Sequence, residues 1–205
     1  MLWLLKRNAS YVLGLDPADW CYDPLMDLLK TSGIDPEGRL DIQRKLTTDI
    51  ADGEFEPFDY VLSHNVMEHV FSLSHTLASC KRFIPNKYGR IIIFADPLFY
   101  SSAGAHLEHV GLQPWGHLTL SQEAVRALAS EHDYYHYRNW LNGMTLTSFL
   151  DGVREAGLCL ERLEIVPDRQ FYNFQHYRGL LPSGIKPFDL LCEGVSCVLA
   201  FPENL

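Results

Sequence analysis

Polar side chains gather where two apolar runs of this chain end. The run 60–62 stops at Ser63 and His64, and the run 90–94 stops just before Asp96. A segment of helix length separates the two runs, which is typical of a βαβ unit with parallel strands. Ligands of such sheets bind outside the carboxyl ends of the strands. We therefore expect a binding site beside Ser63, His64 and Asp96.

Histidines are the candidates for acid–base chemistry. His69 follows Glu68 directly, and His106, His109 and His117 come later in the chain. Histidine suits proton transfer near neutral pH because its unperturbed pKa is about 6.5. We select His69 and His106 as the residues on the substrate side. A Glu-His pair with distant histidines could also bind a divalent metal, but the spacing shows no set of three converging ligands. We predict no metal site.

Asp16 is a candidate nucleotide ligand. It follows the apolar run 11–15 and precedes Pro17. An acidic side chain at the end of a parallel strand can accept hydrogen bonds from both ribose hydroxyls. The alternative is a turn or helix-cap role, which needs no ligand.

The remaining pattern alternates between strand and helix, as in a mostly parallel α/β sheet flanked by helices. Strands are expected at 11–15, 40–46, 60–62, 90–94, 158–166 and 195–201, and helices at 2–8, 24–33, 73–84, 121–130 and 145–157. We expect one domain, 1–205, in which 97–145 forms a lid or substrate region, because long connections often bind ligands. The aromatic segments 131–140 and 171–177 could line a pocket or form a contact between subunits.

Composition excludes several classes of function. The 205 residues carry a formal charge of −9, so a nucleic-acid partner is not expected. No run is long enough for a membrane span or a signal peptide. The five cysteines, Cys21, Cys80, Cys159, Cys192 and Cys197, form no C-x-x-C pair. They indicate reduced thiols and a cytoplasmic protein.

The segment 58–70, Phe-Asp-Tyr-Val-Leu-Ser-His-Asn-Val-Met-Glu-His-Val, resembles the middle of the class I S-adenosylmethionine-dependent methyltransferases of the small-molecule type. The segment 10–17 resembles the second strand of that family, and 111–118 and 141–146 resemble late segments of one of its branches. The resemblance runs from about residue 2 to the C-terminus, carried by the order and spacing of the motifs.

The resemblance implies a Rossmann-like fold that binds S-adenosylmethionine. Asp16 would bind the ribose, Asp49 and the Ile50 backbone would lie beside the adenine amino group, and Ser63 and His64 would face the methionine end. For Asp49 the alternative is a solvated loop carboxylate. The implied activity is methyl transfer to an oxygen or nitrogen of a small-molecule or sugar-like acceptor. The alternative is a non-catalytic member of the fold that serves as an interaction module.

One feature of the family is missing from the sequence. No G-x-G precedes Asp16, and the segment 1–7 resembles the tail of the helix that follows the family's Gly-rich turn. We therefore expect this chain to lack the first strand and cofactor loop, and to bind the cofactor weakly. We also expect that a homodimer or a strand-donating partner could fill the gap, because unpaired inner strand edges need partners.

Overall fold

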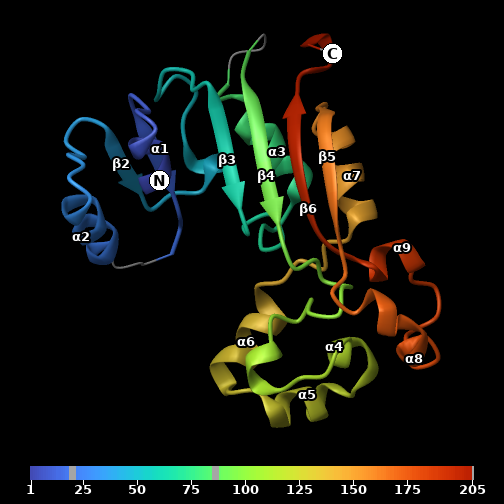
Figure 1. The fold of residues 1–205 in the computed structure, drawn as a ribbon. Helices are drawn as coiled ribbons and strands as arrows, with labels where there is room; N and C mark the ends of the chain where they lie inside the picture. The colour runs from blue at the N-terminus through green and yellow to red at the C-terminus, as the bar shows by residue number, and fades with distance from the viewer. Residues whose placement is uncertain (19–21, 85–87, 205) are drawn as a thin grey trace. The chain divides into compact units, whose positions relative to one another are not determined.

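The computed structural model describes residues 1–18, 22–84 and 88–204. The chain divides into two compact units, Met1–Phe55 and Glu56–Leu205, each with its own sheet (Figure 1). None of the helices in the described ranges is both long and apolar enough to cross a membrane. Cys21, one of the cysteines expected to be reduced, lies outside the described residues. The other four cysteines are free thiols.

The N-terminal unit is built on a pair of parallel strands, β1 (Val12–Leu15) and β2 (Leu40–Gln43). Helix α1 (Leu2–Lys6), helix α2 (Asp23–Thr31) and the short 3-10 helix η1 (Thr47–Asp49) complete it. Its core is small, with Leu5, Val12 and Leu29 buried. Arg39, which directly precedes β2, links the end of α1 to the sheet by donating to the carbonyl oxygens of Leu5 and Ala9.

The C-terminal unit contains a four-stranded sheet in the order β3 (Tyr60–His64), β4 (Arg90–Ala95), β6 (Cys192–Ala200) and β5 (Cys159–Pro167). The first two strands are parallel, with Leu62 opposite Ile92. β6 runs antiparallel to both of its neighbours. The carboxyl ends of β3 and β4 therefore meet at one edge, as the two apolar runs predict.

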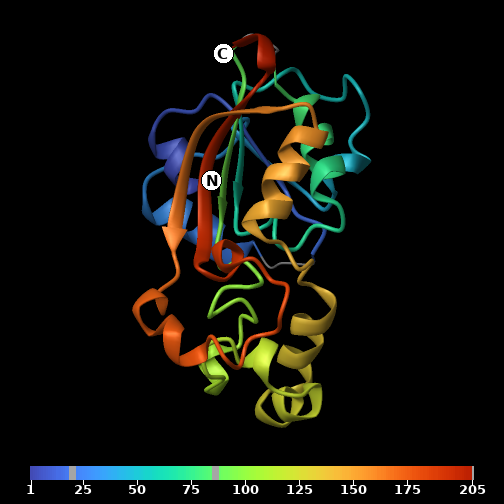
Figure 2. The same cartoon turned by 90° about the vertical axis from the view of Figure 1, so that its right-hand side faces the viewer.

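Two helices, α3 (Leu73–Lys81) and α7 (Leu146–Glu155), cover one face of this sheet (Figures 1 and 2). Ser72 and Thr145 cap them by accepting hydrogen bonds from backbone N–H groups of the first turn. The core between the helices and the sheet is apolar, and its fully buried members include Leu77, Ile91, Ile93, Phe149 and Leu199.

The connection between β4 and α7 is a folded element with its own core. It contains η2 (Glu108–Val110), α4 (Gly116–Thr119), α5 (Gln122–Leu128) and α6 (Glu131–Asn139). Ala105, Leu107, Val125 and Tyr137 form its buried centre. Shorter helices follow β5: η3 (Phe171–Asn173), α8 (Phe174–Tyr177) and α9 (Pro187–Leu190), and η4 (Pro202–Asn204) follows β6. The lid function of 97–145 stays a prediction.

The α/β fold class is confirmed, whereas the arrangement of strands differs from the expectation of one mostly parallel sheet. β1 pairs with β2 in a separate sheet, and β5 and β6 add antiparallel pairs to the parallel β3–β4 pair. The segment 2–6 is helical, as expected. Helix α6 was not predicted, because its only buried residue is Tyr137 and a helical apolar stripe is missing.

Candidate functional site

The backbone turns sharply at the carboxyl end of β3. Asn65 adopts a left-handed conformation with φ of 51°, and its N–H donates to the carbonyl oxygen of Phe94 at 2.7 Å. His64 is exposed and stacks on the Phe94 ring with 5.1 Å between ring centroids. The Ser63 hydroxyl oxygen is buried and has no hydrogen-bond partner among the described residues. A left-handed backbone conformation at a residue other than glycine is uncommon and often marks a functional turn.

Glu68 lies in the segment after this turn and is almost fully buried, with 2% of its surface exposed. Within the described ranges neither carboxylate oxygen has a hydrogen-bond partner of good geometry. Burial raises the pKa of Glu68 to about 7, and the neighbouring Asp96 carboxylate acts in the same direction. The backbone N–H groups of Glu68 and Asp96 offset only part of this rise.

His69 stands beside Glu68 in a fixed orientation. Its Nδ1 donates to the carbonyl oxygen of Trp140 at 3.0 Å, which places the proton on Nδ1. Its Nε2 lies 4.0 Å from Oε1 of Glu68. The imidazole is one-third exposed, so it connects the buried carboxylate with the surface. This arrangement lets Nε2 accept a proton next to a negative charge.

The His106 ring meets the His69 ring edge to face, with 5.4 Å between centroids. Its Nε2 donates to the carbonyl oxygen of Pro97 at 3.2 Å, and its backbone is left-handed with φ of 56°. Burial lowers the pKa of His106, and His69 adds to that effect while the Pro97 carbonyl opposes it. The structure therefore brings together the two histidines selected from the sequence, with His106 favoured in the neutral form.

Asp96 follows β4, and its Oδ1 is buried with no hydrogen-bond partner among the described residues. Burial raises the pKa of Asp96, Glu193 raises it further, and Arg169 opposes them. Arg169 itself is held by ion pairs with Glu193 and Glu108. The site therefore has a buried carboxylate, Glu68, beside the half-buried Asp96, whose charge disfavours ionisation of Glu68.

His117 adds a third fixed imidazole. Its Nε2 donates to the carbonyl oxygen of Phe99 at 2.7 Å, while its Nδ1 is buried without a partner in the described ranges. Burial lowers the pKa of His117 to about 4, and nearby His106 acts in the same direction. His117 is therefore neutral at physiological pH.

A pocket with a volume of about 270 Å³ opens beside this group and is lined by Phe99, Tyr137, Arg138, Leu141, Asn142 and Gly143. Asn142 joins the pocket to the loop that carries Glu68. Its backbone N–H donates to the Glu68 carbonyl, and its side-chain amide donates to the carbonyl oxygens of Met67 and Val70.

The remaining predicted residues belong to the N-terminal unit. Asp16 follows β1, and its Oδ1 accepts from the Ala18 N–H at 2.8 Å. Asp49 is exposed, and its Oδ2 accepts from the Leu46 N–H at 3.0 Å. Ile50 is buried. Both carboxylates thus fill a local capping role, and each still has lone pairs for further hydrogen bonds.

The predicted residues fall into two groups. Ser63, His64, His69 and His106 lie around the carboxyl ends of β3 and β4, whereas Asp16, Asp49 and Ile50 lie in the other unit. Sequence reasoning named Glu68 only as a neighbour of His69. It offered the segment 131–140 as a pocket lining or a subunit contact, and Tyr137 and Arg138 of that segment line the pocket. No group of three or more potential metal ligands converges in the described part of the chain.

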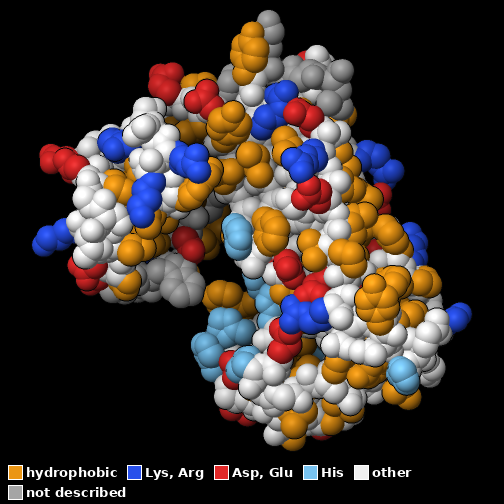
Figure 3. All heavy atoms as spheres, viewed as in Figure 1, with side chains coloured by type: hydrophobic (Ala, Val, Ile, Leu, Met, Phe, Trp, Pro, Cys, Tyr) orange, Lys and Arg blue, Asp and Glu red, His pale blue; other side chains and the backbone are white. Residues whose placement is uncertain are grey.

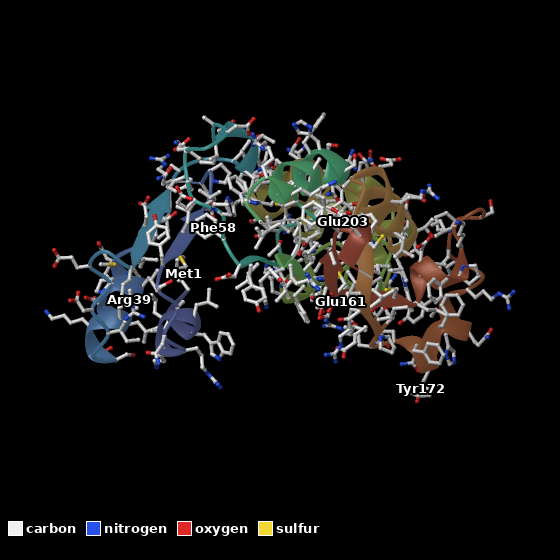
Figure 4. All side chains as sticks on the ribbon, turned by 90° about the horizontal axis from the view of Figure 1, so that it is seen from above. Met1, Arg39, Phe58, Glu161, Tyr172 and Glu203 are labelled. Carbon is white, nitrogen blue, oxygen red and sulfur yellow. The ribbon has the colours of Figure 1, made fainter. Side chains whose placement is uncertain are left out.

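Histidine side chains also gather on the surface near α6 (Figure 3). His132 and His136 lie 4.3 Å apart by ring centroids, and His136 lies 4.5 Å from Trp140. These rings belong to the aromatic segment 131–140, whose Tyr137 and Arg138 line the pocket. The second aromatic segment, 171–177, includes Tyr172, which projects into solvent (Figure 4).

Among the comparisons with known proteins, the one with solved structures finds chains of similar fold. No family model matches the chain, and no curated protein sequence matches it. Among solved structures, an S-adenosylmethionine-dependent methyltransferase from Mesorhizobium loti is 14% identical, with a TM-score of 0.55, covering 96% of this chain and 83% of that one. Geranyl diphosphate C-methyltransferase from Streptomyces coelicolor is also 14% identical, with a TM-score of 0.57 and coverages of 98% and 68%.

A candidate S-adenosylmethionine-dependent methyltransferase from Listeria monocytogenes gives the same result at 12% identity, with a TM-score of 0.55 and coverages of 97% and 83%. The likeness extends over nearly all of this chain in each case. The structural likeness establishes the architecture, whereas sequence identities this low leave the substrates open. The chain therefore has the fold of the class I S-adenosylmethionine-dependent methyltransferases.

Proposed function

We propose that this protein is an S-adenosylmethionine-dependent methyltransferase that acts on an oxygen or nitrogen of a small-molecule acceptor. One observation carries the proposal: the buried, unpartnered carboxylate of Glu68 faces an imidazole, His69, whose orientation is fixed by the Trp140 carbonyl. A perturbed carboxylate in a pocketed site is typical of catalytic groups. The fold supplies the context in which this pair would work.

Each unit carries residues whose chemistry suits a part of the cofactor. Asp16 ends a parallel strand and retains lone pairs for ribose hydroxyls beside its bond to Ala18. Asp49 and Ile50 are the proposed adenine contacts, and Ser63 and His64 the proposed contacts of the methionine end. The buried hydroxyl of Ser63 and Oδ1 of Asp96 both lack partners among the described residues, and a polar ligand would satisfy them. When bound, the cofactor supplies an electrophilic methyl group on a sulfonium.

The protein's own residues handle the proton of the acceptor. His69 Nε2 accepts it, and the charge of the ionised Glu68, whose Oε1 lies 4.0 Å from that nitrogen, stabilises the resulting imidazolium. His106 packs against His69 and helps to hold its ring in place. Since the pKa of Glu68 is about 7, the carboxylate ionises near neutral pH. The reaction rate should therefore rise with pH across that range.

Glu68→Gln tests this role. We expect turnover to fall about a hundredfold or more, since a positioned acid–base group contributes that much, while affinity for S-adenosylhomocysteine stays the same. Release of S-adenosylhomocysteine with a panel of small phenols, alcohols and amines measures turnover, and calorimetry measures affinity. Glu155→Gln, an exposed glutamate at the end of α7, is the matched control. Full activity of Glu68→Gln would exclude the proposed role.

The cofactor contact is tested separately by Asp16→Ala. Loss of charge-assisted hydrogen bonds to the ribose should weaken binding of S-adenosylhomocysteine at least about tenfold. Asp35→Ala is a close control, because Asp35 precedes Pro36 and its Oδ1 accepts from the Glu37 N–H, as Asp16 does with Ala18. Equal affinities of the two variants would mean that Asp16 only stabilises a turn. The same titration of the wild-type chain measures its affinity for S-adenosylhomocysteine, which we expect to be weak because no G-x-G precedes Asp16.

The second candidate function is that of a non-catalytic interaction module. It is favoured because Asp16 and Asp49 each already accept a hydrogen bond from a nearby backbone N–H, a capping role that needs no cofactor. Absence of saturable S-adenosylhomocysteine binding by the wild-type chain would select it. A cytoplasmic location and a homodimer or strand-donating partner remain part of our proposal; the free thiols of the four described cysteines support the location.

A further inference from the structure

Arg138 lines the pocket beside the catalytic candidates without a carboxylate partner. The protein is acidic, with 26 Asp and Glu against 17 Lys and Arg. Five other arginines of the C-terminal unit each contact a carboxylate: Arg90, Arg126, Arg154, Arg162 and Arg169. Arg138 forms no salt bridge in the ranges that the structure describes, and no acidic side chain lines its pocket. Its charge is therefore available to an anion.

Two aromatic rings that stack on each other belong to the lining of the same pocket. The rings of Phe99 and Tyr137 are parallel, with an angle of 2° between their planes and 6.5 Å between their centroids. The Arg138 guanidinium lies 5.9 Å from the centre of the Tyr137 ring. Aromatic side chains pack well against planar ligands, and Leu141 adds an apolar side chain to the lining.

The pocket lining is hydrogen bonded to the loop that carries the proposed proton acceptor. Asn142 donates from its backbone N–H to the Glu68 carbonyl at 3.0 Å, and the neighbouring Trp140 carbonyl accepts from His69 Nδ1. A ligand whose anionic end contacts Arg138 thus lies next to the loop that positions Glu68 and His69. The volume of about 270 Å³ suits a single-ring molecule.

We propose that this pocket binds a small planar carboxylic acid, with its carboxylate on Arg138 and its ring against Phe99 and Tyr137, and that this acid is the acceptor class. The assignment as acceptor rests on the proposed methyl transfer. In that reaction the acid carries a hydroxyl group on its ring. The ring hydroxyl oxygen gains the methyl group, the sulfonium–methyl bond breaks, and the hydroxyl proton goes to His69. Binding of the acid is measurable without turnover.

The experiment uses the full chain and the three hydroxybenzoate isomers as probes, with affinity measured by calorimetry. Two analogues each remove one feature: 4-hydroxybenzamide removes the charge, and trans-4-hydroxycyclohexanecarboxylate removes the flat ring. We expect at least one hydroxybenzoate to bind saturably. The amide should bind at least about tenfold more weakly, because it lacks the charge-assisted bidentate bonds that arginine forms with carboxylates. The cyclohexane acid should also bind more weakly.

Variants then locate the anion. Arg138→Gln should weaken binding of the acid at least about tenfold and leave binding of the amide unchanged. Arg178→Gln is the matched control, since Arg178 is also exposed and lies outside the pocket lining. Equal binding of acid and amide, an unchanged Arg138→Gln, or no saturable binding by any isomer at 10 mM, on the order of the weakest specific affinities, would each overturn the proposal.

Mass spectrometry of reactions with S-adenosylmethionine separates the two proposals. Formation of a methyl ether of the bound acid supports both, whereas a methyl ester would overturn the placement of the carboxylate on Arg138. Saturable, Arg138-dependent binding without methylation supports the planar-acid site and counts against the methyl transfer and hence against the assignment as acceptor.

Discussion

At the scale of single residues, Glu68 combines burial with carboxylate oxygens that have no hydrogen-bond partner of good geometry among the described residues. An ionised carboxylate in that position has lost its hydration without full compensation. Its pKa of about 7 is the measurable consequence. The same property makes the residue a source of pH-dependent stability, independent of any catalytic role.

The sign of that dependence follows from the raised pKa. Below about pH 4.5 Glu68 is protonated in both the folded and the unfolded chain, and its stabilising effect is complete. As the pH rises, the unfolded chain ionises first, and the folded state loses stability until Glu68 ionises at about pH 7. The loss between these limits is roughly 3.5 kcal/mol at most, from about 2.5 pKa units at about 1.4 kcal/mol each.

Glu68→Gln should remove this loss. Relative to wild type, we expect the free energy of unfolding of the variant to increase by roughly 2–3 kcal/mol between pH 4.5 and pH 8. Urea unfolding at several pH values measures the difference, with Glu155→Gln as a variant that should follow wild type throughout. Parallel pH profiles for Glu68→Gln and wild type would contradict the raised pKa.

The sequence predicts part of this site for a physical reason. Ser63, His64 and Asp96 follow apolar runs whose order indicates parallel strands, and parallel strands bring their carboxyl ends to one edge. The burial of Glu68 depends instead on tertiary contacts, including the bond from the Asn142 N–H to its carbonyl. Such contacts between distant segments leave no local pattern.

At the scale of elements, the segment between β4 and α4 folds against itself through a tight turn. The Phe99 carbonyl oxygen in this turn accepts from His117 Nε2, and Trp115 Nε1 donates to the Tyr100 carbonyl. Gly104 lies so close to this backbone that a Cβ on it would overlap the carbonyl oxygen of Phe99. Glycine is therefore required here for close approach of two backbone segments.

Gly104→Ala should destabilise the protein by roughly 2 kcal/mol or more, because a backbone atom cannot move aside as a side chain can. It should also displace the Phe99 carbonyl from His117. Chemical denaturation measures the first effect, and the NMR resonances of the His117 ring report the second. Gly179→Ala is the control, since a Cβ there meets no atom within 4 Å. Similar stabilities of the two variants would show that the turn relaxes at little cost.

Elements with a clear apolar stripe or cap were predictable, and others were not. Thr145 and Ser121 indicate helix starts, which α7 and α5 confirm. Helix α6 could not be predicted from the sequence, because Tyr137 is its buried residue and its other aromatic and histidine rings are exposed or half-buried. The antiparallel direction of β6 could not be predicted either, because a strand's hydrophobic pattern does not encode the direction of its neighbours.

At the scale of the whole molecule, the two units differ in the size of their cores. The sheet of the C-terminal unit has four strands and a core that includes residues from both helices on its face. The N-terminal unit has a two-stranded sheet and three buried apolar residues in its cluster. Two-stranded sheets and small cores are marginally stable on their own. The N-terminal unit should therefore open more often.

Amide hydrogen exchange tests this difference and its link to the cofactor. We expect protection in β4 and β6 to exceed that in β1 and β2 by at least about tenfold, because local opening free energies follow core size. Saturating S-adenosylhomocysteine should slow exchange in β1 and β2, by up to about a hundredfold at one hundred times Kd, because it binds only the folded unit. Asp16→Ala should reduce that gain, whereas Asp35→Ala should retain it. If the ligand binds without changing exchange in β1 and β2, the proposed contacts of Asp16, Asp49 and Ile50 are wrong, even if methyl transfer takes place.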